Sequence, residues 1–386
     1  MHTTPVAQAP SKSPVENPQP QTAIAAAKAW KAQLPREWRA PSNVRGLVLF
    51  GVSLTAYVAT FVLMHISPKV LGVYVFGALN IISIGAMFVA GHDAAHRTLV
   101  RTGWLNRILG RIAMLPAWHP FTSWVHAHNT LHHGFTSFKG KHPDFCPLSK
   151  QDFDALPRWR QSVERFYRTP LGIGVCYVVE FYGKYLLWPN STRRSPWVFA
   201  ERCDRLLVLG FIAFQFVASY WLVTLSGRHL LPHWLAGPAA VVIAWAVWAY
   251  FMGMASYQQH THPRTAWYDN LDEWNFYHVQ LRSSTHVAMP AFVDRMLHNI
   301  MDHPAHHLDP TIPMYQLPES QKLLEQHAGE HAVVVPWTMK EFLRTTRVCK
   351  LYDYQEHRWL DFDGRPTSPS GLSGLPPMPQ AASTAL

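Results

Sequence analysis

Four long apolar segments dominate the pattern of hydrophobic and polar positions along the chain. Apart from one basic residue at an end, they carry no charge. Each is long enough for a helix that crosses a bilayer, which takes about 20 residues. Asn80 and Gln215 are their main polar interruptions. The pattern predicts an all-α integral membrane protein whose four spans form two hairpins. The predicted spans are approximately 46–66, 70–90, 205–225 and 235–256.

The positions of the basic residues predict how these spans are oriented. Of the 34 Lys and Arg residues, only Lys69 and Arg228 lie in the two short turns between paired spans. The others belong to, or directly adjoin, the long segments 1–45, 91–204 and 257–386. Because cytoplasmic loops carry an excess of Lys and Arg, both termini and both large segments are predicted to be cytoplasmic, with the spans in the cell (inner) membrane.

Eight histidines form three short clusters, and a ninth, His260, lies between the second and third. Residues three and four positions apart share a face of an α-helix, so each cluster is predicted to direct two or three ring nitrogens toward one point. Neutral imidazole is the commonest metal ligand, and one metal takes about four to six ligands. Nine imidazoles therefore suit two metals. The clusters are His92 and His96; His128, His132 and His133; and His303, His306 and His307.

The predicted topology brings these clusters to one side of the membrane. The first cluster begins at the end of the second span, and His260 follows the fourth. We therefore expect a cytoplasmic helical cap that carries a histidine-rich dimetal site just beneath the bilayer, within reach of a lipid-soluble substrate. Pro304 is compatible with a helix, because proline is tolerated in a first helical turn, and Asp302 is expected to cap that turn.

Polar residues near the clusters are candidates for a second layer of contacts, in which a carboxylate orients a metal-bound imidazole through its other nitrogen. The candidate carboxylates are Asp93, Asp302, Asp269 and Asp272. The other histidines near the clusters are expected to be hydrogen-bonded or exposed. They are His119, His142, His262, His278, His286 and His298.

The chain divides into four predicted regions. Within the first, residues 22–34 are expected to form a short helix that lies on the membrane. Within the second, the apolar segments 105–121 and 171–188 are interrupted by charged residues and are predicted to be interfacial helices. The regions are a disordered or interfacial tail (1–44), the membrane and metal-binding domain (45–320), a cytoplasmic C-terminal cap (321–363) and a Pro-, Ser- and Gly-rich disordered tail (364–386).

Charge and cysteine content exclude other classes of protein. The net charge of +10 is typical of a chain whose basic residues face an anionic cytoplasmic leaflet. The basic residues do not form a compact stripe interleaved with aromatic residues, so nucleic-acid binding is not predicted. The four cysteines are scattered, with no CxxC pair, which argues against a zinc ribbon and a disulfide framework.

Taken together, these motifs resemble the membrane fatty acid desaturase family over residues 85–320, in particular the acyl-lipid branch that includes the delta-12 (omega-6) enzymes. The resemblance implies a di-iron centre, O2 as co-substrate, and insertion of a double bond into the acyl chain of a membrane lipid. The motifs that carry it are Leu297-His298-Asn299-Ile300, the third histidine cluster with Thr311-Ile312-Pro313-Met314-Tyr315, Gln259-His260-Thr261-His262-Pro263, and Phe121-Thr122-Ser123-Trp124.

The resemblance also implies which residues hold the two irons. One departure concerns the second histidine box, which is HxxxHH here and usually HxxHH in delta-12 enzymes. It leaves His126 as an alternative to His128; His128 is favoured because it lies four positions before His132. The match to the family makes His298 a candidate for the second layer. The implied iron ligands are His92, His96, His128, His132, His133, His260, His303, His306 and His307.

Members of the family often carry a fused cytochrome b5 domain, whose HPGG signature is absent from this sequence. The electrons are therefore expected to come from a separate donor, of the ferredoxin or cytochrome b5 type. Two alternatives stay open. One is a hydroxylase, epoxygenase or acetylenase on the same scaffold. The other is a membrane hydrolase with zinc, a metal that has no redox chemistry.

Overall fold

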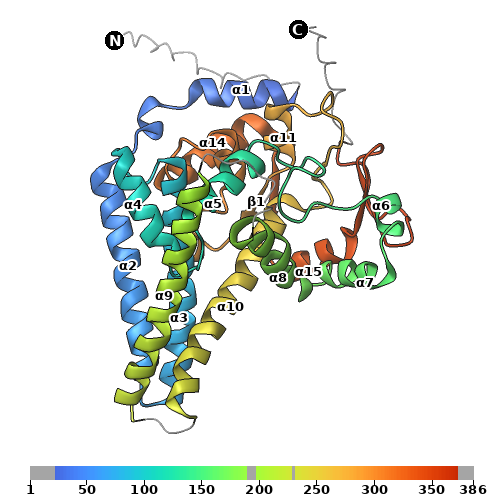
Figure 1. Cartoon of the computed structure of the whole chain (residues 1–386). Coiled ribbons are helices and arrows are strands. Elements are labelled where there is room, and N and C mark those ends of the chain that lie inside the picture. Colours follow the sequence, from blue (N-terminus) through green and yellow to red (C-terminus); the bar gives the residue numbers. More distant parts are fainter. Residues whose placement is uncertain (1–21, 189–196, 228–230, 373–386) are drawn as a thin grey trace, which may run out of the picture.

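Four long helices and a cap at one of their ends make up the protein (Figure 1). The computed structural model describes residues 22–188, 197–227 and 231–372. The long helices have 24 to 28 residues and are apolar enough to cross a membrane, so each of the four predicted spans coincides with a helix of membrane-spanning length. Arg228, in the second predicted turn, lies outside the described residues. The long helices are α2 (Asn43–Ile66), α3 (Val70–His96), α9 (Val198–Leu225) and α10 (His233–His260).

Local sequence explains where the first two long helices begin and end. The Ser42 hydroxyl accepts a hydrogen bond from the Arg45 N–H at 3.3 Å and caps the start of α2. A turn at Ser67–Lys69 leads into α3, which ends at Arg97 in a left-handed conformation with φ of 65°. α2 packs along α3, α9 packs along α10, and α10 also packs against α3. Many large apolar side chains on the outer faces are exposed, as expected for a surface that lipid covers.

The two polar residues inside the predicted spans are buried between helices. The Asn80 side-chain amide donates to the Tyr57 carbonyl and to the Thr60 hydroxyl, and thereby joins α3 to α2. Gln215 in α9 accepts from Trp118 Nε1 at 2.7 Å and donates to the Tyr57 hydroxyl at 2.8 Å. Because an unpaired polar group is costly in an apolar environment, these bonds stabilise one arrangement of the spans.

The cap is built from short helices and loops. Its helices come from segments far apart in the sequence, which Figure 1 shows gathered around the ends of α3 and α10. They are α1 (Ala23–Gln33), η1 (Arg36–Arg39), α4 (Gly103–Met114), α5 (Phe121–Val125), η2 (His126–His132), α6 (Lys150–Asp154), α7 (Arg158–Tyr167), α8 (Gly172–Cys176), η3 (Tyr177–Leu187), α11 (Phe276–Arg282), α12 (Ala291–Met296), α13 (His303–Leu308), η4 (Met314–Gln316), α14 (Leu317–Ala328), η5 (Gly329–His331) and α15 (Met339–Val348).

The described residues also contain two small sheets, so the expectation of an all-α fold is wrong in this detail. In one sheet, β1 (Thr285–Ala288) pairs in parallel with β2 (Val333–Pro336). In the other, β3 (Leu351–Asp353) pairs antiparallel with β4 (Arg358–Leu360). The strands have only three or four residues, too few to leave a readable alternation in the sequence.

The two segments predicted to be interfacial are helical but are interrupted. The first contains α4, which ends at Met114, and residues 115–120 form a turn before α5. One face of α4 packs on α3, while Trp104 and Ile108 on the other face are exposed. The second segment contains α8 and η3, and α8 packs against α10. Each segment therefore presents an apolar face outward beside the long helices.

Both ends of the described chain are packed against the cap, contrary to expectation. α1 does not present its apolar face to a membrane: it packs on α11 and α14, and the fully buried Trp30 donates from Nε1 to the Ser320 carbonyl at 3.0 Å. Residues 364–372 are likewise ordered, since Arg282 donates to the Gly371 carbonyl at 2.8 Å. Residues 1–21 and 373–386 of the predicted tails lie outside the described residues.

The close contact between α8 and α10 gives a test of the packing. A Cβ added at Gly174 would lie 2.5 Å from Tyr250 Cδ2 and 2.9 Å from Tyr250 Cα. We expect Gly174→Ala to force the two helices apart and to lower the free energy of unfolding by about 1–3 kcal/mol, measured as a lower thermal midpoint in detergent. Gly210→Ala in α9 is the matched control, because nothing lies within 4 Å of its added Cβ. Equal midpoints for the two variants would contradict the packing.

Candidate metal centre

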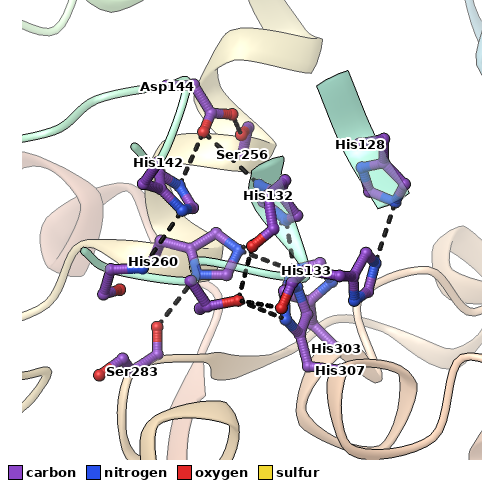
Figure 2. A network of polar contacts seen from close by, with 12 residues as sticks. His128, His132, His133, His142, Asp144, Ser256, His260, Ser283, His303 and His307 are labelled. Carbon is purple, nitrogen blue, oxygen red and sulfur yellow. Dashed lines mark hydrogen bonds and ion pairs between the residues drawn. The ribbon is translucent and has the colours of Figure 1, made fainter. Parts of the chain in front are cut away.

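Nine histidines converge in the cap at the ends of α3 and α10, and Figure 2 labels six of them, from the second and third clusters and His260. They are the nine that the sequence indicates, and all except His96 are buried. Their ring nitrogens form two groups, within each of which the candidate ligand atoms lie within 4.8 Å of one another. The five-histidine group is His92, His96, His128, His133 and His306, and the four-histidine group is His132, His260, His303 and His307.

A π-helix divides the second histidine cluster between these groups. In η2, hydrogen bonds join residues five positions apart, and the His133 N–H donates to the His128 carbonyl at 3.0 Å. His128 and His133 therefore share one face, with their Nε2 atoms 3.1 Å apart, while His132 belongs to the other group. The expectation that His128 and His132 point to one site assumed α-helical spacing and is wrong. His126 lies in neither group.

The third cluster is also divided, because α13 lies between the two groups. His306 Nε2 is 3.1 Å from His133 Nε2 in the five-histidine group, and His303 Nε2 is 2.9 Å from His260 Nε2 in the four-histidine group. Proline is in the first turn of α13, as predicted, and Asp302 is at the N-cap position. The Asp302 side chain makes no capping hydrogen bond, so that part of the prediction is wrong.

In two members of the four-histidine group, the hydrogen bond made by Nδ1 shows that the lone pair of Nε2 points toward the other members. His260 Nδ1 lies 3.0 Å from the Ser283 carbonyl, which can only accept, so this nitrogen carries the proton and Nε2 is a bare lone pair. His307 Nδ1 lies 2.7 Å from Gln280 Oε1 and is protonated for the same reason. Both Nε2 atoms are about 3 Å from His132 Nε2. Facing lone pairs repel unless a cation lies between them, so the donor set fits a metal ion.

Burial favours the neutral, metal-binding form of these rings. Loss of solvent lowers the pKa of His303, His306 and His307 well below the usual range, and neighbouring imidazoles lower it further. The same causes lower the pKa of His128 and His133. Neutral rings have a nitrogen lone pair available at physiological pH, so a metal need not displace a proton from these rings in order to bind.

Gln280 in α11 joins two of the histidine clusters and was not found from the sequence. Its side chain is fully buried; Nε2 donates to the His133 carbonyl at 2.8 Å, and Oε1 faces His307. The bond at Nε2 fixes the orientation of the amide. Thr136 adds a second contact to His307, at 3.3 Å from Nδ1. A single glutamine in the sequence between two clusters belongs to no recognisable motif, so its role is visible only in the tertiary structure.

The predicted second layer is only partly found. Asp93 is buried and lies 3.7 Å from His92 Nδ1, while its other oxygen accepts from the Met314 N–H at 2.8 Å. Asp302 instead lies 3.3 Å from His286 Nε2, and His298 is 3.0 Å from the Ser53 hydroxyl. The remaining two candidates, Asp269 and Asp272, are exposed and belong to neither group.

A carboxylate that sequence analysis missed lies beside the four-histidine group. Asp144 is buried, with one oxygen 2.9 Å from His142 Nε2 and 3.7 Å from His132 Nδ1. Ser256 in α10 donates a short hydrogen bond to its other oxygen. The only signal in the sequence is an acidic residue in His142-Pro143-Asp144, soon after the second cluster. His142 itself is buried and accepts from the Ser137 N–H, as expected for a hydrogen-bonded histidine.

A small cavity of about 50 Å³ opens onto both histidine groups. His128 and His132 reach it from η2 and His303 from α13, and its other walls are mostly apolar side chains of α3, η3 and α10. Its apolar lining residues include Phe88, Val89, Trp124, Tyr177, Phe181, Met252, Ala255 and Ile300. Helices of membrane-spanning length and a buried pair of imidazole sites beside an apolar cavity define a membrane protein with a candidate dimetal centre.

Comparison with known proteins gives the family. The family model described as fatty acid desaturase matches residues 64–338. The chain is 27% identical to an sn-1 oleoyl-lipid 12-desaturase of Picosynechococcus sp. over 81% of this chain and 85% of that protein. It is 24% identical to a chloroplastic omega-6 fatty acid desaturase of Arabidopsis thaliana over 86% of this chain and 70% of that protein. It is also 24% identical to an sn-1 acyl-lipid omega-3 desaturase (ferredoxin) of Nostoc sp. over 78% of this chain and 80% of that protein.

The chain therefore belongs to the fatty acid desaturase family. This confirms the resemblance found in the histidine clusters and the residues around them. The protein is an oxidoreductase that acts as a fatty acid desaturase.

An ion pair near the centre gives a pH-dependent test of the cap. His286 Nδ1 in β1 lies 2.5 Å from Glu325 in α14. Burial alone lowers the pKa of His286, but the hydrogen bond to Glu325 and the charge of Asp302 raise it above its usual value. The ion pair therefore makes its full contribution to stability when the pH is below the pKa of this histidine in the unfolded chain, about 6.5. The contribution is lost as the pH rises through the higher pKa of His286 in the folded protein.

We therefore expect Glu325→Gln to lower the free energy of unfolding at pH 6, by up to about 1 kcal/mol, and to change it less at pH 9. Thermal unfolding in detergent at both pH values measures the difference. Glu330→Gln, at an exposed position of η5, is the control for loss of one charge. Equal destabilisation by Glu325→Gln at both pH values would show that charge on His286 is not involved.

Proposed function

We propose that the protein is an O2-dependent di-iron desaturase that introduces a cis double bond into an acyl chain of a membrane lipid, at a delta-12 or omega-type position. The observation that carries the proposal is the pair of buried imidazole groups that open onto one apolar cavity at the ends of membrane-length helices. An apolar cavity beside helices of membrane-spanning length suits the acyl chain of a lipid better than a water-soluble substrate.

The reaction itself calls for a redox metal. Desaturation removes two hydrogens from adjacent methylenes; with O2, two electrons and two protons, it yields the alkene and two waters. Iron, when bound, supplies the oxidising power that no side chain has, whereas zinc has no redox chemistry. Imidazole is a suitable ligand for iron, and the two groups supply five and four imidazoles.

In this proposal the five-histidine group holds one iron and the four-histidine group the other. Ser283 and Gln280 hold the proton of His260 and His307 on Nδ1 and so direct Nε2 inward. The apolar cavity walls position the acyl chain and exclude water from the reacting methylenes. His128, not His126, is the ligand from the start of the second box, because only His128 lies in a group.

We also propose the membrane arrangement that the sequence predicts. α2 with α3 and α9 with α10 form two hairpins, and the cap lies on the cytoplasmic side of the cell membrane with both termini. The packing of these helix pairs and the position of the Ser67–Lys69 turn, remote from the cap in Figure 1, support this arrangement. The electrons come from a separate donor of the ferredoxin or cytochrome b5 type.

The substrate class rests on the relatives. Those named above include an oleoyl-lipid 12-desaturase and an omega-6 fatty acid desaturase, and they align with most of this chain. Ferredoxin appears in the printed name of one relative, which supports that donor class here. The same scaffold could also carry a hydroxylase or acetylenase. The mass of the product distinguishes a hydroxylase, whereas an acetylenase gives the same loss of mass and is distinguished by the position of the new unsaturation, at an existing double bond.

Lipid analysis of a heterologous host tests the activity. We expect the wild-type gene to convert a monounsaturated acyl chain into a product about 2 Da lighter, with the new double bond located by fragmentation. His306→Ala should abolish the product while the protein still inserts into the membrane, because a ligand of the five-histidine group is lost. A product about 16 Da heavier would instead identify a hydroxylase, and activity without O2 and reductant would favour a zinc hydrolase.

Metal content tests the ligand assignment in the second box. We expect His128→Ala to lower the iron content of the purified protein from two equivalents toward one, because this side chain lies in the five-histidine group. His126→Ala, two positions away on the same helix, should keep both equivalents. Elemental analysis measures the iron. If His126→Ala lost iron and His128→Ala retained both equivalents, His126 would be the ligand and His128 would not.

A further inference from the structure

Asp144 is a buried carboxylate whose neighbours come from three different parts of the chain. In Figure 2 it lies at the edge of the histidine network, next to His142, His132 and Ser256. Oδ1 is 2.9 Å from His142 Nε2 and 3.7 Å from His132 Nδ1, and Oδ2 accepts from the Ser256 hydroxyl. Within the described part of the chain its ion-pair partners are imidazoles, not Lys or Arg.

The surrounding hydrogen bonds define which atoms carry protons. The Ser137 N–H donates to His142 Nδ1 at 3.2 Å, so the proton of the neutral His142 ring is on Nε2, facing Asp144. His132 directs Nε2 toward His260 and His307, so its Nδ1 is the nitrogen that faces the carboxylate. The carboxylate therefore lies behind His132, on the side away from the four-histidine group.

His132, His142 and Asp144 are close enough to suggest a third cation site, but the protonation pattern argues against it. A cation there would have to bind His132 Nδ1 while a second cation binds Nε2, which requires an imidazolate. A carboxylate that lies 3.7 Å from a protonated Nδ1 needs no such ionisation. This is the usual way in which an acidic side chain orients a metal-bound histidine.

Electrostatics gives the carboxylate a second role. Neutral imidazoles contribute no negative charge, and two divalent cations would bring four positive charges into a buried site. Buried charges are costly unless they are compensated. Each histidine group has a buried carboxylate 3.7 Å from Nδ1 of one member: Asp93 beside His92, and Asp144 beside His132.

We propose that Asp144 is a positioning residue for the four-histidine group: it orients His132 through Nδ1 and compensates the charge of the metal bound there. The proposal rests on the proposed function, since it requires that both groups bind metal. His142 and Ser256 hold the carboxylate in place from the sides that His132 leaves open. The five-histidine group does not depend on Asp144.

The test is metal titration of the full chain in detergent, with Co(II) and with Fe(II) under anaerobic conditions, in competition with a chelator. Wild type should bind two equivalents. Asp144→Asn, which keeps the size but removes the charge, should weaken one equivalent 10- to 100-fold, the usual effect of losing such a partner, and leave the other unchanged. Asp144→Glu, which restores the charge, should recover most of the lost affinity.

Asp154→Asn is the matched control for charge, because this exposed carboxylate is paired with Lys150 away from the site; it should bind like wild type. Mössbauer spectra of ⁵⁷Fe-loaded protein add a readout that is independent of turnover: Asp144→Asn should alter the signal of one iron only. Full binding of both equivalents by Asp144→Asn with wild-type spectra would overturn the proposal. So would loss of both equivalents, because it would show a role in folding rather than at one site. A wild-type chain that binds fewer than two equivalents would instead refute the proposed function.

Discussion

The structure depends on the convergence of neutral imidazoles whose lone pairs face one another. Ser283 and Gln280 fix the protons of His260 and His307 on Nδ1, so both Nε2 atoms can only accept, and His132 Nε2, with at most one proton, can donate to only one of them. A bound cation turns this repulsion into ligand bonds, and metal binding then contributes directly to the stability of the cap. The histidines come from four elements of distant sequence, so bound metals would join these elements to one another.

The long helices determine where this centre can form. α3 and α10 each end in histidines, so the packing of one long helix against the other brings the first box next to His260. The Asn80 and Gln215 hydrogen bonds fix the helices against one another within the apolar region. The histidines of η2 and α13 then complete the two groups from the cap. Membrane packing and the metal centre are thus parts of one arrangement.

The sequence predicts the four spans and the nine converging histidines because both leave repeated, local signals. It does not predict how the histidines are divided, because the α-helical spacing of His128 and His132 is replaced by a π-helix that pairs His128 with His133. Gln280 and Asp144 leave no repeated signal; their roles arise from burial beside distant residues. The sequence of α1 predicts a short helix that lies on the membrane, and only the structure shows that Trp30 is buried between α1 and α14.

The division by the π-helix has a consequence for the two sites. Because His128 and His133 occupy the five-histidine group, His132 is left as the only member of its box in the four-histidine group, and its other nitrogen faces Asp144. An α-helix would place His128 and His132 on one face and would direct His133 elsewhere. The wider helix therefore keeps all three histidines of the box at the centre. The two groups differ in imidazole number, and each has its own buried carboxylate, so two metals bound there would be electronically distinct.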